Sequence, residues 1–451
     1  MTLADTPSFP EQTSGTFATV GKIAKIAFPL MVGSLAAAGL QIVKAGLLSY
    51  TGQEADLYLL SMVTPAFIFM LAFLESLAIT NQVFSSKSVN NWAKGDVFAA
   101  TKIFSIMGAV LTCIVAAGFY GTSFFIGGLW AEGPQILPQM SLFVLSLLPF
   151  LLFEMRNGAL RGQGRTGLAL LPFVVLIVTD IAVTWVAVST FGLGFHGVLI
   201  GNIAGPLVAM PLAFYLLRRE IGDAERGAPE KFKKHMIGLT IGVAGPVFAS
   251  MFAGSASAAV IFPALANLGQ DIASGFLLIV RIRIMFIIPA IAVGSAIAIL
   301  VNQMPEQGQG AEKRNILITG ILSVLVVYGF ATLGIDALRG EMVGFVVGPE
   351  NAILHSTTAG LMRALAVTFF FIAAFTMVQV ILEHLGHGVF VLLVTIVFEL
   401  ATIGLTLFVA ARGYDVSAYV TVMNVTAVAS FLVLAVVLAN FIRKLERSDA
   451  V

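Results

Sequence analysis

Apolar residues occupy most of the chain in long runs that short polar stretches interrupt. A helix needs roughly 20 consecutive, mostly apolar residues to cross a bilayer, and about twelve runs meet that length. They begin near Ile23, Leu57, Val97, Ile136, Leu168, Gly197, Met236, Ile272, Ile316, Ala352, Val389 and Ser417. Polar stretches such as "NNWAKGD", "RREIGDAERGAPEKFKK" and "PEQGQGAEKR" separate them. The pattern predicts an all-α polytopic membrane protein with twelve transmembrane helices.

Composition agrees with this prediction. Of 451 residues, 58% are hydrophobic and only 11% are charged, which is too little charge to cover the surface of a soluble protein. The net charge of +1 and the lack of a long basic run exclude nucleic acid as an expected partner. A single cysteine, Cys113, excludes a disulfide framework.

Lysine and arginine orient the helices. They cluster beside alternate connections, from Lys22 and Lys25 near the start to Arg443 and Lys444 near the end. By the positive-inside rule both termini are cytoplasmic, which requires an even number of spans. We therefore expect a multi-pass plasma (inner) membrane protein with a cytoplasmic tail at 1–16, a six-helix lobe at 17–220, a cytoplasmic linker at 221–235 and a second six-helix lobe at 236–451.

The two halves of the chain resemble each other. "FPLMVGSLAAAGLQIVKAGLLSYTGQEA" is similar to "GPVFASMFAGSASAAVIFPALANLGQDI", and in this alignment Pro29 matches Pro246. Farther on, "ALRGQGRT" matches "ILEHLGHG", which pairs Gly164 with Gly386. Repeats of the same orientation are related by an axis along the membrane normal, and the substrate path then lies between them. The repeat predicts two pseudo-symmetric six-helix lobes.

Several motifs carry a resemblance to a known family. They are "KAGLLSYTG" after Pro29, Gly95-Asp96 after the second helix, "ALRGQGRT" after the fourth, and "VRIRIMFIIPAIAVGSAIAILVNQ" on the eighth. Together they resemble the multidrug and toxic compound extrusion (MATE) family, within the wider superfamily that includes oligosaccharide and lipid flippases. The resemblance implies two lobes around a central cavity and a monomeric antiporter without cofactors. It would export a small organic compound in exchange for protons or sodium.

Lys44 is the most unusual residue of the first lobe. Where the resemblance implies an acid on the first helix this chain has Lys44, whereas the implied aspartate on the fifth helix is present as Asp180. At a rise of 1.5 Å per residue, Lys44 lies about 28 Å from Lys25 and Asp180 about 22 Å from Arg165, so their depths overlap. We expect them to form an ion pair, with Glu75 as a second acid in the same lobe. The pair is either a proton-sensitive switch for ion coupling or a static fastening of two helices.

Further intramembrane charges are candidates for substrate binding. We expect Arg281 and Arg363, together with Glu399, to line the cavity and to make the second lobe cationic, which would suit carboxylate-bearing substrates. The alternative pairs one arginine with Glu399 and lets the others reach the membrane interface. Glu154 is expected to form a local ion pair with Arg156.

Alternative functions remain. A flippase or exporter for an amphiphilic or anionic molecule, such as a lipid-linked or siderophore-like compound, would need a strongly cationic cavity. An enzyme would need a nucleophile, acid and base at one depth, and the sequence shows none. The cluster Glu383-His384-x-x-His387 lacks the order of a metalloprotease motif, so no metal site is expected.

Overall fold

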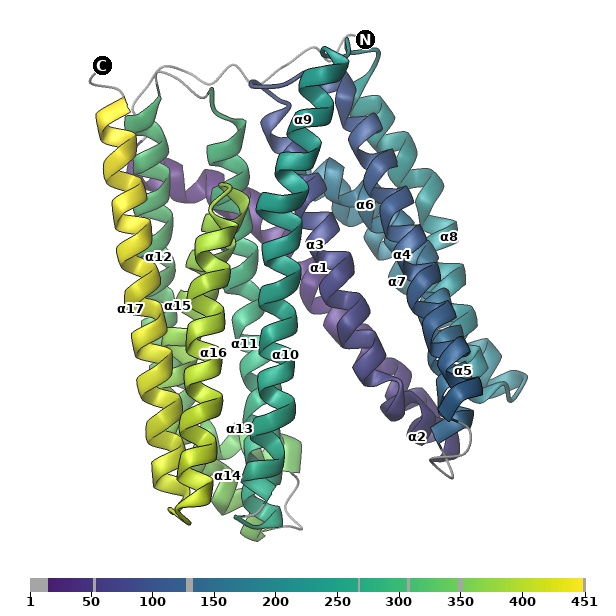
Figure 1. Ribbon diagram of the computed structural model, residues 1–451, viewed down its shortest axis with the longest axis vertical. Helices are drawn as coiled ribbons and strands as arrows, with labels where there is room; N and C mark the ends of the chain where they lie inside the picture. Colours follow the sequence, from purple (N-terminus) through teal and green to yellow (C-terminus); the bar gives the residue numbers. More distant parts are fainter. Residues whose placement is uncertain are drawn as a thin grey trace.

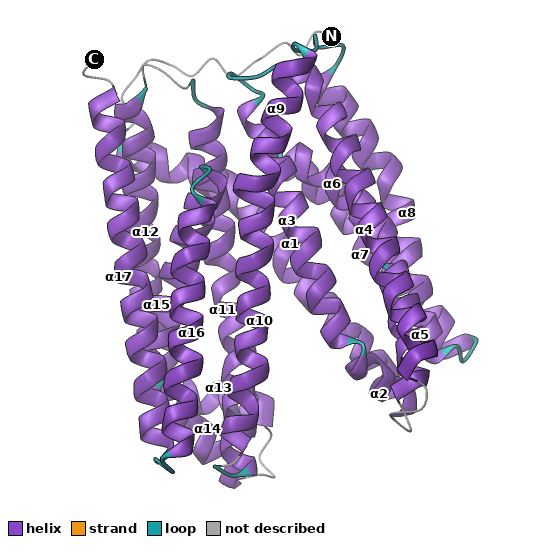
Figure 2. Cartoon of the chain, viewed as in Figure 1, coloured by secondary structure: helices purple, strands orange, loops and turns teal. Residues whose placement is uncertain are grey.

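The computed structural model describes residues 15–51, 54–126, 133–266, 268–305, 309–347 and 352–448, which contain helices and no strand (Figure 2). The helices are α1 (Thr16–Tyr50), α2 (Glu54–Met62), α3 (Thr64–Lys87), α4 (Val97–Ile126), α5 (Gly133–Ser146), α6 (Leu148–Gly162), α7 (Thr166–Trp185), α8 (Gly194–Ile221), α9 (Pro229–Leu239), α10 (Gly245–Ala266), α11 (Gln270–Gln303), α12 (Gly310–Ala337), α13 (Arg339–Val347), α14 (Ala352–Ala364), α15 (Ala366–His384), α16 (Gly388–Ala411) and α17 (Val416–Ser448). One 3₁₀ turn (Lys94–Asp96) and two π-helical turns (Val186–Thr190 and Thr240–Ala244) adjoin them.

Twelve of the described segments are long and apolar enough to cross a membrane, which confirms the predicted number of spans. Some spans consist of two helical pieces. The fourth is α5 followed by α6, and it breaks at Leu147, two residues before a proline. Proline has no N–H and its ring clashes with the carbonyl of the residue four positions earlier, so the chain restarts its helix at Leu148.

The spans form two bundles that lie close together at one end and apart at the other (Figure 1). Helices α3 to α8 make the first lobe and α11 to α17 make the second. Helix α17 ends on the side of the molecule where α9 begins, and this is also the side where the lobes meet (Figure 1). The predicted arrangement of two six-helix lobes is therefore present.

Helix α1 passes from one lobe to the other. Its first part packs into the second lobe, where Ile23 and Ile26 share a core with Ala290, Ile297 and Leu317. Its last part packs into the first lobe, where Leu40 contacts the core of Phe173 and Leu176. Pro29 lies between the two parts. A single helix therefore touches the cores of both lobes.

The corresponding segment of the second half crosses in the opposite sense. Met236 and Val243, in α9 and the π-helical turn, share a core with Phe84 of the first lobe, whereas Leu265 at the end of α10 packs with Phe276 of the second. This exchange reproduces the crossing of α1, as the internal repeat requires.

The expected lobe boundaries stay a prediction. Helix α8 ends at Ile221, where the expected linker at 221–235 begins, and α9 begins at Pro229, inside that linker.

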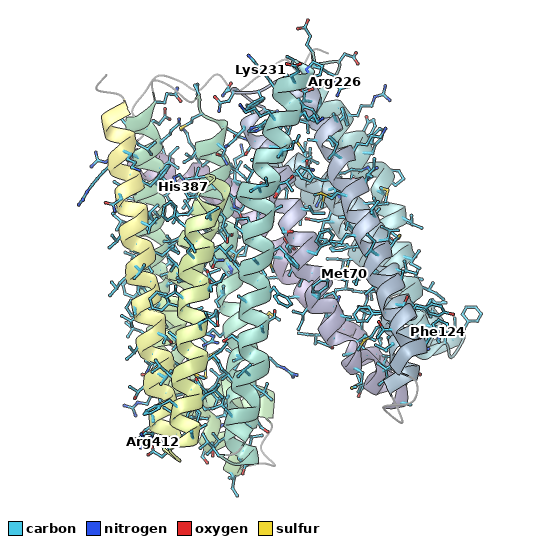
Figure 3. All side chains as sticks on the ribbon, viewed as in Figure 1. Met70, Phe124, Arg226, Lys231, His387 and Arg412 are labelled. Atoms are coloured by element: carbon cyan, nitrogen blue, oxygen red, sulfur yellow. The ribbon has the colours of Figure 1, made fainter. Side chains whose placement is uncertain are left out.

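The outer surface is suited to lipid. Helix α12 alone exposes Leu322, Val326, Phe330 and Leu333, and Phe330 is 71% accessible. Charged side chains gather at the ends instead, with Arg226 and Lys231 at one end and Arg412 at the other (Figure 3). A continuous apolar belt of this size between two charged rims is typical of a membrane protein and not of a soluble monomer.

Candidate functional site

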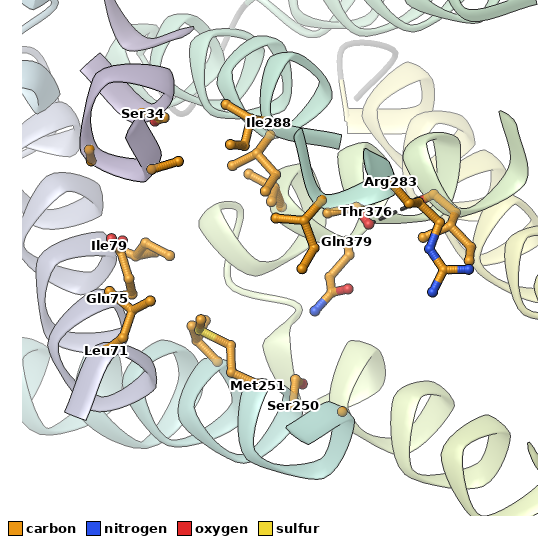
Figure 4. A pocket seen from close by; sticks show the side chains of 18 of the residues that line it. Ser34, Leu71, Glu75, Ile79, Ser250, Met251, Arg283, Ile288, Thr376 and Gln379 are labelled. Carbon is orange, nitrogen blue, oxygen red and sulfur yellow. Dashed lines mark hydrogen bonds between the residues drawn. The ribbon is translucent and has the colours of Figure 1, made fainter. Parts of the chain in front are cut away.

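A cavity of about 880 Å³ lies between the two lobes, with walls from α1, α3, α6, α7 and α8 on one side and α10, α11, α15, α16 and α17 on the other. Most of its wall is apolar and aromatic, including Phe67, Phe150, Phe276 and Phe398. Figure 4 shows Glu75 on the first-lobe side, and Arg283, Thr376 and Gln379 on the second-lobe side. The cavity has the size and the mixed lining of a site for a small organic molecule.

The ion pair expected between Lys44 and Asp180 is present in the wall of this cavity. Lys44 Nζ donates hydrogen bonds to Asp180 Oδ2 at 2.7 Å and to Asn202 Oδ1 at 2.5 Å. The two charged side chains are only 1% and 3% exposed. The other oxygen of Asp180 accepts from Thr184 Oγ1 at 3.1 Å. The charges are therefore held away from water by partners from three helices.

Close packing of α7 against α8 makes this arrangement possible. A Cβ atom placed on Gly201 would lie 2.0 Å from Thr184 Oγ1 and 2.6 Å from Asp180 Oδ1. Only glycine allows α8 to come this near, and the same helix then supplies Asn202 to the lysine. Asn202 is oriented in turn by its own donation to Ser146 Oγ at 3.0 Å. The lysine site therefore depends on one small residue that no motif of the sequence marks.

Glu75 also lines the cavity, but its charged neighbours are Glu154 and Arg161 instead of Lys44. Arg161 forms the ion pair with Glu154. The expected pair of Glu154 with Arg156 is therefore wrong. Arg156 donates to the carbonyl of Leu152 at 2.5 Å and lines a second cavity, because residues two apart on a helix point to different sides.

The spacing of Glu154, Asn157 and Arg161 could have revealed this site. Positions three and seven residues apart lie on one face of a helix, so the three side chains point together into the cavity. The signal in the sequence is thus this helical spacing. Closeness along the chain favours Arg156 as the partner of Glu154 and is misleading. Helix α6 contributes a polar stripe to the cavity wall.

The second lobe differs from the expectation in two of three residues. Arg281 and Arg363 are exposed and lie outside the cavity lining, so their assignment to the cavity is corrected. Arg283 lines the cavity in place of Arg281, and it interacts electrostatically with Glu399, which was expected there. The rotation of α11 about its axis decided between the two arginines, and that rotation depends on packing.

Glu383 is a further acid in the cavity. Gln379 Nε2 donates to its Oε1 at 2.9 Å. With Glu383 included, the charged residues of the lining comprise five acids (Glu75, Glu154, Asp180, Glu383 and Glu399) and three bases (Lys44, Arg161 and Arg283). The second lobe thus contributes one base and two acids, so the expected cationic second lobe is wrong.

His384 and His387 follow Glu383 but serve other contacts. His384 Nδ1 donates to the carbonyl of Val380 at 2.8 Å, which leaves Nε2 to accept from Gln82 at 3.3 Å. The ring of His387 packs edge-on against Phe441, and partial burial lowers the pKa of this histidine below its usual value. No group of three or more metal-binding side chains occurs in the described ranges.

Hydrogen bonds join the two lobes at the end where the lobes meet. Gln303 Nε2 in the second lobe donates to the carbonyl of Gly162 in the first at 2.9 Å, while Gln82 reaches His384 in the opposite direction. Asn90 Nδ2 adds a bond to the carbonyl of Gln303 at 2.5 Å. Gly164, at φ +77°, leaves room for the Gln303 amide, which lies 2.8 Å from where a Cβ would be.

The two glutamines occupy corresponding places in the internal repeat. The dipeptide Asn-Gln occurs at Asn81-Gln82 near the end of α3 and again at Asn302-Gln303 at the end of α11. Gln303 contacts Gly162 and Gln82 contacts His384, and these two partners are themselves at matching positions of the repeat. The repeated dipeptide was the sequence signal for this latch, which we define as Gln82, Asn90 and Gln303 with their partners.

Comparison with known proteins places the fold. No family model matches the chain, and no curated protein matches it either. Solved structures match over nearly the whole length at low sequence identity. The Vibrio cholerae MATE transporter VcmN in its bent form has a TM-score of 0.82 at 14% identity and covers 96% of this chain and 99% of its own.

Two further structures also match over nearly the whole chain. An outward-facing multidrug resistance MATE transporter of the MOP superfamily has a TM-score of 0.78 at 16% identity, covering 97% of this chain and 99% of its own. A MOP superfamily transporter from Pyrococcus furiosus, described as having a binding pocket of reversed polarity, has a TM-score of 0.77 at 16% identity and covers 97% and 100%. The structural neighbours of this chain are therefore MATE and MOP superfamily transporters.

Proposed function

We propose that this chain, which has the fold of the MATE transporters, is a secondary active exporter of organic compounds driven by a proton or sodium gradient. The observation that carries the proposal is the cavity walled by both lobes with the buried Lys44–Asp180 pair in its wall. Charges inside a membrane are costly and mark transport pathways by default. The similarity to solved transporters supports the same class of function.

The lining favours lipophilic cations as substrates. Five acids against three bases leave an excess of carboxylates, and the aromatic walls can pack against flat apolar groups or hold a cation over a ring face. An anionic or lipid-linked substrate, the alternative expected from a cationic second lobe, loses its basis because Arg281 and Arg363 lie outside the cavity.

In the proposed mechanism the Lys44 ammonium acts as a tethered cation. In the ionised state it neutralises Asp180 and fastens α1 to α7. A proton that enters the cavity and binds a carboxylate oxygen of Asp180 removes the negative charge, so Lys44 loses its ionic partner and is held by neutral acceptors such as Asn202 Oδ1. Helix α1 is then free to shift, and because its first part lies in the core of the second lobe, the shift is transmitted across the cavity.

Orientation follows from the charges at the rims. The end where the lobes meet carries Arg226 and Lys231, whereas Arg412 lies at the other end (Figure 3). By the positive-inside rule we propose that the latch faces the cytoplasm and that this conformation opens outward. We further propose that the protein works as a monomer in the plasma membrane with both termini in the cytoplasm.

Transport in proteoliposomes tests the proposal. A pH jump with and without sodium, run against cationic dyes and carboxylate metabolites, should drive uptake of cations and identify the coupling ion. The double variant Lys44→Ala, Asp180→Ala should lose the dependence on the gradient, whereas Arg281→Gln, on the exposed side of α11, should transport normally. Near-normal proton-coupled export by the double variant would rule out the switch and leave a static fastening.

A further inference from the structure

A second polar site lies in the first lobe, apart from the Lys44–Asp180 pair. It contains the carboxylates of Glu75 on α3 and Glu154 on α6, and Arg161 pairs with Glu154 and interacts electrostatically with Glu75. All three line the cavity, as does Asn157. The guanidinium pairs with one oxygen of Glu154, so one base faces two acids. With both acids ionised, the site carries one negative charge without a counter-charge.

Several polar atoms of this site have no partner. Arg161 Nε is a buried donor without a hydrogen bond. Glu154 is 3% exposed and Asn157 is 2% exposed, and Glu154 Oε2 and Asn157 Oδ1 are likewise buried without a hydrogen bond. Both are acceptors and both belong to side chains in the cavity wall. A buried acceptor without a donor costs about 1–3 kcal/mol, and more when it is charged. Arg161 Nε forms no hydrogen bond to these oxygens, so both acceptors remain unsatisfied.

Among the described residues, α10 and α15 add no free cation to this part of the lining. Helix α10 contributes Ser250 and Met251, which do not carry charge (Figure 4). Helix α15 contributes the acid Glu383 and the neighbouring His384, whose Nδ1 and Nε2 are both engaged.

Other basic groups near this part of the first lobe are engaged or turned away. On α4, Lys102 lines the second cavity together with Arg156 of α6. Lys44 is held by Asp180 and Asn202. Within the described residues, the excess charge of Glu75 and Glu154 has to be balanced from solution.

We propose that Glu75 and Glu154 form a proton-binding site, in which Glu75 takes up a proton from the cavity and donates it toward the free Oε2 of Glu154. One proton converts two carboxylates and one guanidinium from a net charge of minus one to zero. A sodium ion would need several oxygen ligands and would be repelled by the Arg161 guanidinium beside it, whereas a proton requires only the carboxyl groups. Arg161 already pairs with one oxygen of Glu154, whereas Glu75 has no ion-pair partner among the described residues, so we assign the proton to Glu75.

This site deepens the proposed function, on which its role in transport rests. It gives the first lobe a proton acceptor that is independent of Lys44. Glu75 lies about two helical turns from Gln82 on α3. A proton bound at Glu75 therefore alters the charge near the latch without breaking the Lys44–Asp180 pair.

Labelling with dicyclohexylcarbodiimide tests the site without any transport. This apolar reagent attacks protonated carboxyl groups in apolar surroundings, and mass spectrometry of peptides locates the adduct. In the full-length protein near neutral pH we expect an adduct on Glu75 and none on Asp180, whose two oxygens accept from Lys44 and Thr184. The adduct should decrease as the pH rises, and replacing potassium chloride by sodium chloride should not change it.

Two conservative variants are expected to act in opposite directions. Glu154→Gln frees Arg161 to pair with Glu75, so labelling of Glu75 should fall about tenfold or more, since an adjacent opposite charge favours the ionised form. Arg161→Gln removes the cation and should increase the labelling. Absence of an adduct on Glu75 in the unmodified protein, protection by sodium, or unchanged labelling in Glu154→Gln would each overturn the proposal. Absence of the Glu75 adduct in unmodified protein that still performs gradient-driven export would refute this site alone, not the proposed function.

Discussion

Removing one partner of the Lys44–Asp180 pair is expected to destabilise the protein far more than removing both. The two side chains are 1% and 3% exposed, so Lys44→Met leaves a carboxylate with Thr184 as its remaining hydrogen-bond donor, and Asp180→Leu leaves an ammonium with Asn202. Breaking a buried ion pair in this way costs about 3–5 kcal/mol for each single variant. The two costs together would amount to about 6–10 kcal/mol if they were additive.

The double variant Lys44→Met, Asp180→Leu places apolar groups of similar size in the same space. An apolar replacement of a buried pair is often close to neutral. What remains is the loss of partners for Asn202 Oδ1 and Thr184 Oγ1, which we expect to cost about 1–3 kcal/mol. The coupling energy between the two positions should therefore be several kcal/mol.

Equilibrium unfolding in mixed detergent micelles, followed by tryptophan fluorescence, measures the four free energies of this cycle. The exposed pair Arg165–Glu220, with its atoms 3.0 Å apart and side chains 44% and 18% exposed, is a matched control whose coupling should stay below about 1 kcal/mol. If the double variant were destabilised by the full amount of the two single costs, the pair would not be a buried unit and the reasoning would fail.

Three further variants test other features of the structure. Gly201→Ala should destabilise the folded protein strongly, because its Cβ would lie 2.0 Å from a threonine oxygen, whereas Gly167→Ala, with no atom within 4 Å, should be tolerated in the same unfolding assay. Arg283→Gln should change the concentration dependence of dye transport and Arg281→Gln should not, since only the former lines the cavity; equal effects would contradict the assigned rotation of α11. Gln303→Ala removes a hydrogen bond between the lobes. A membrane-impermeant maleimide applied from the latch side should therefore label a cysteine placed in the cavity faster in this variant than in the parent protein. An unchanged labelling rate would argue against the latch.

The sequence was sufficient for the features that the bilayer imposes. The hydrophobic thickness of the bilayer sets the length of each span, so twelve apolar runs already determined twelve membrane spans. The repeat determined two lobes. The helical rise is constant, so counting residues along two helices was enough to place Lys44 and Asp180 at one depth.

The tertiary structure decided what depends on rotation and on close approach. Whether Arg281 or Arg283 faces the cavity is set by the helices that pack around α11, and a spacing of two residues carries no such information. The same holds for α1 and its crossing between the lobes, because an apolar helix surface packs equally well against either core. Hydropathy follows from single residues and the solvent around them, but the choice of partner is a property of the packed assembly.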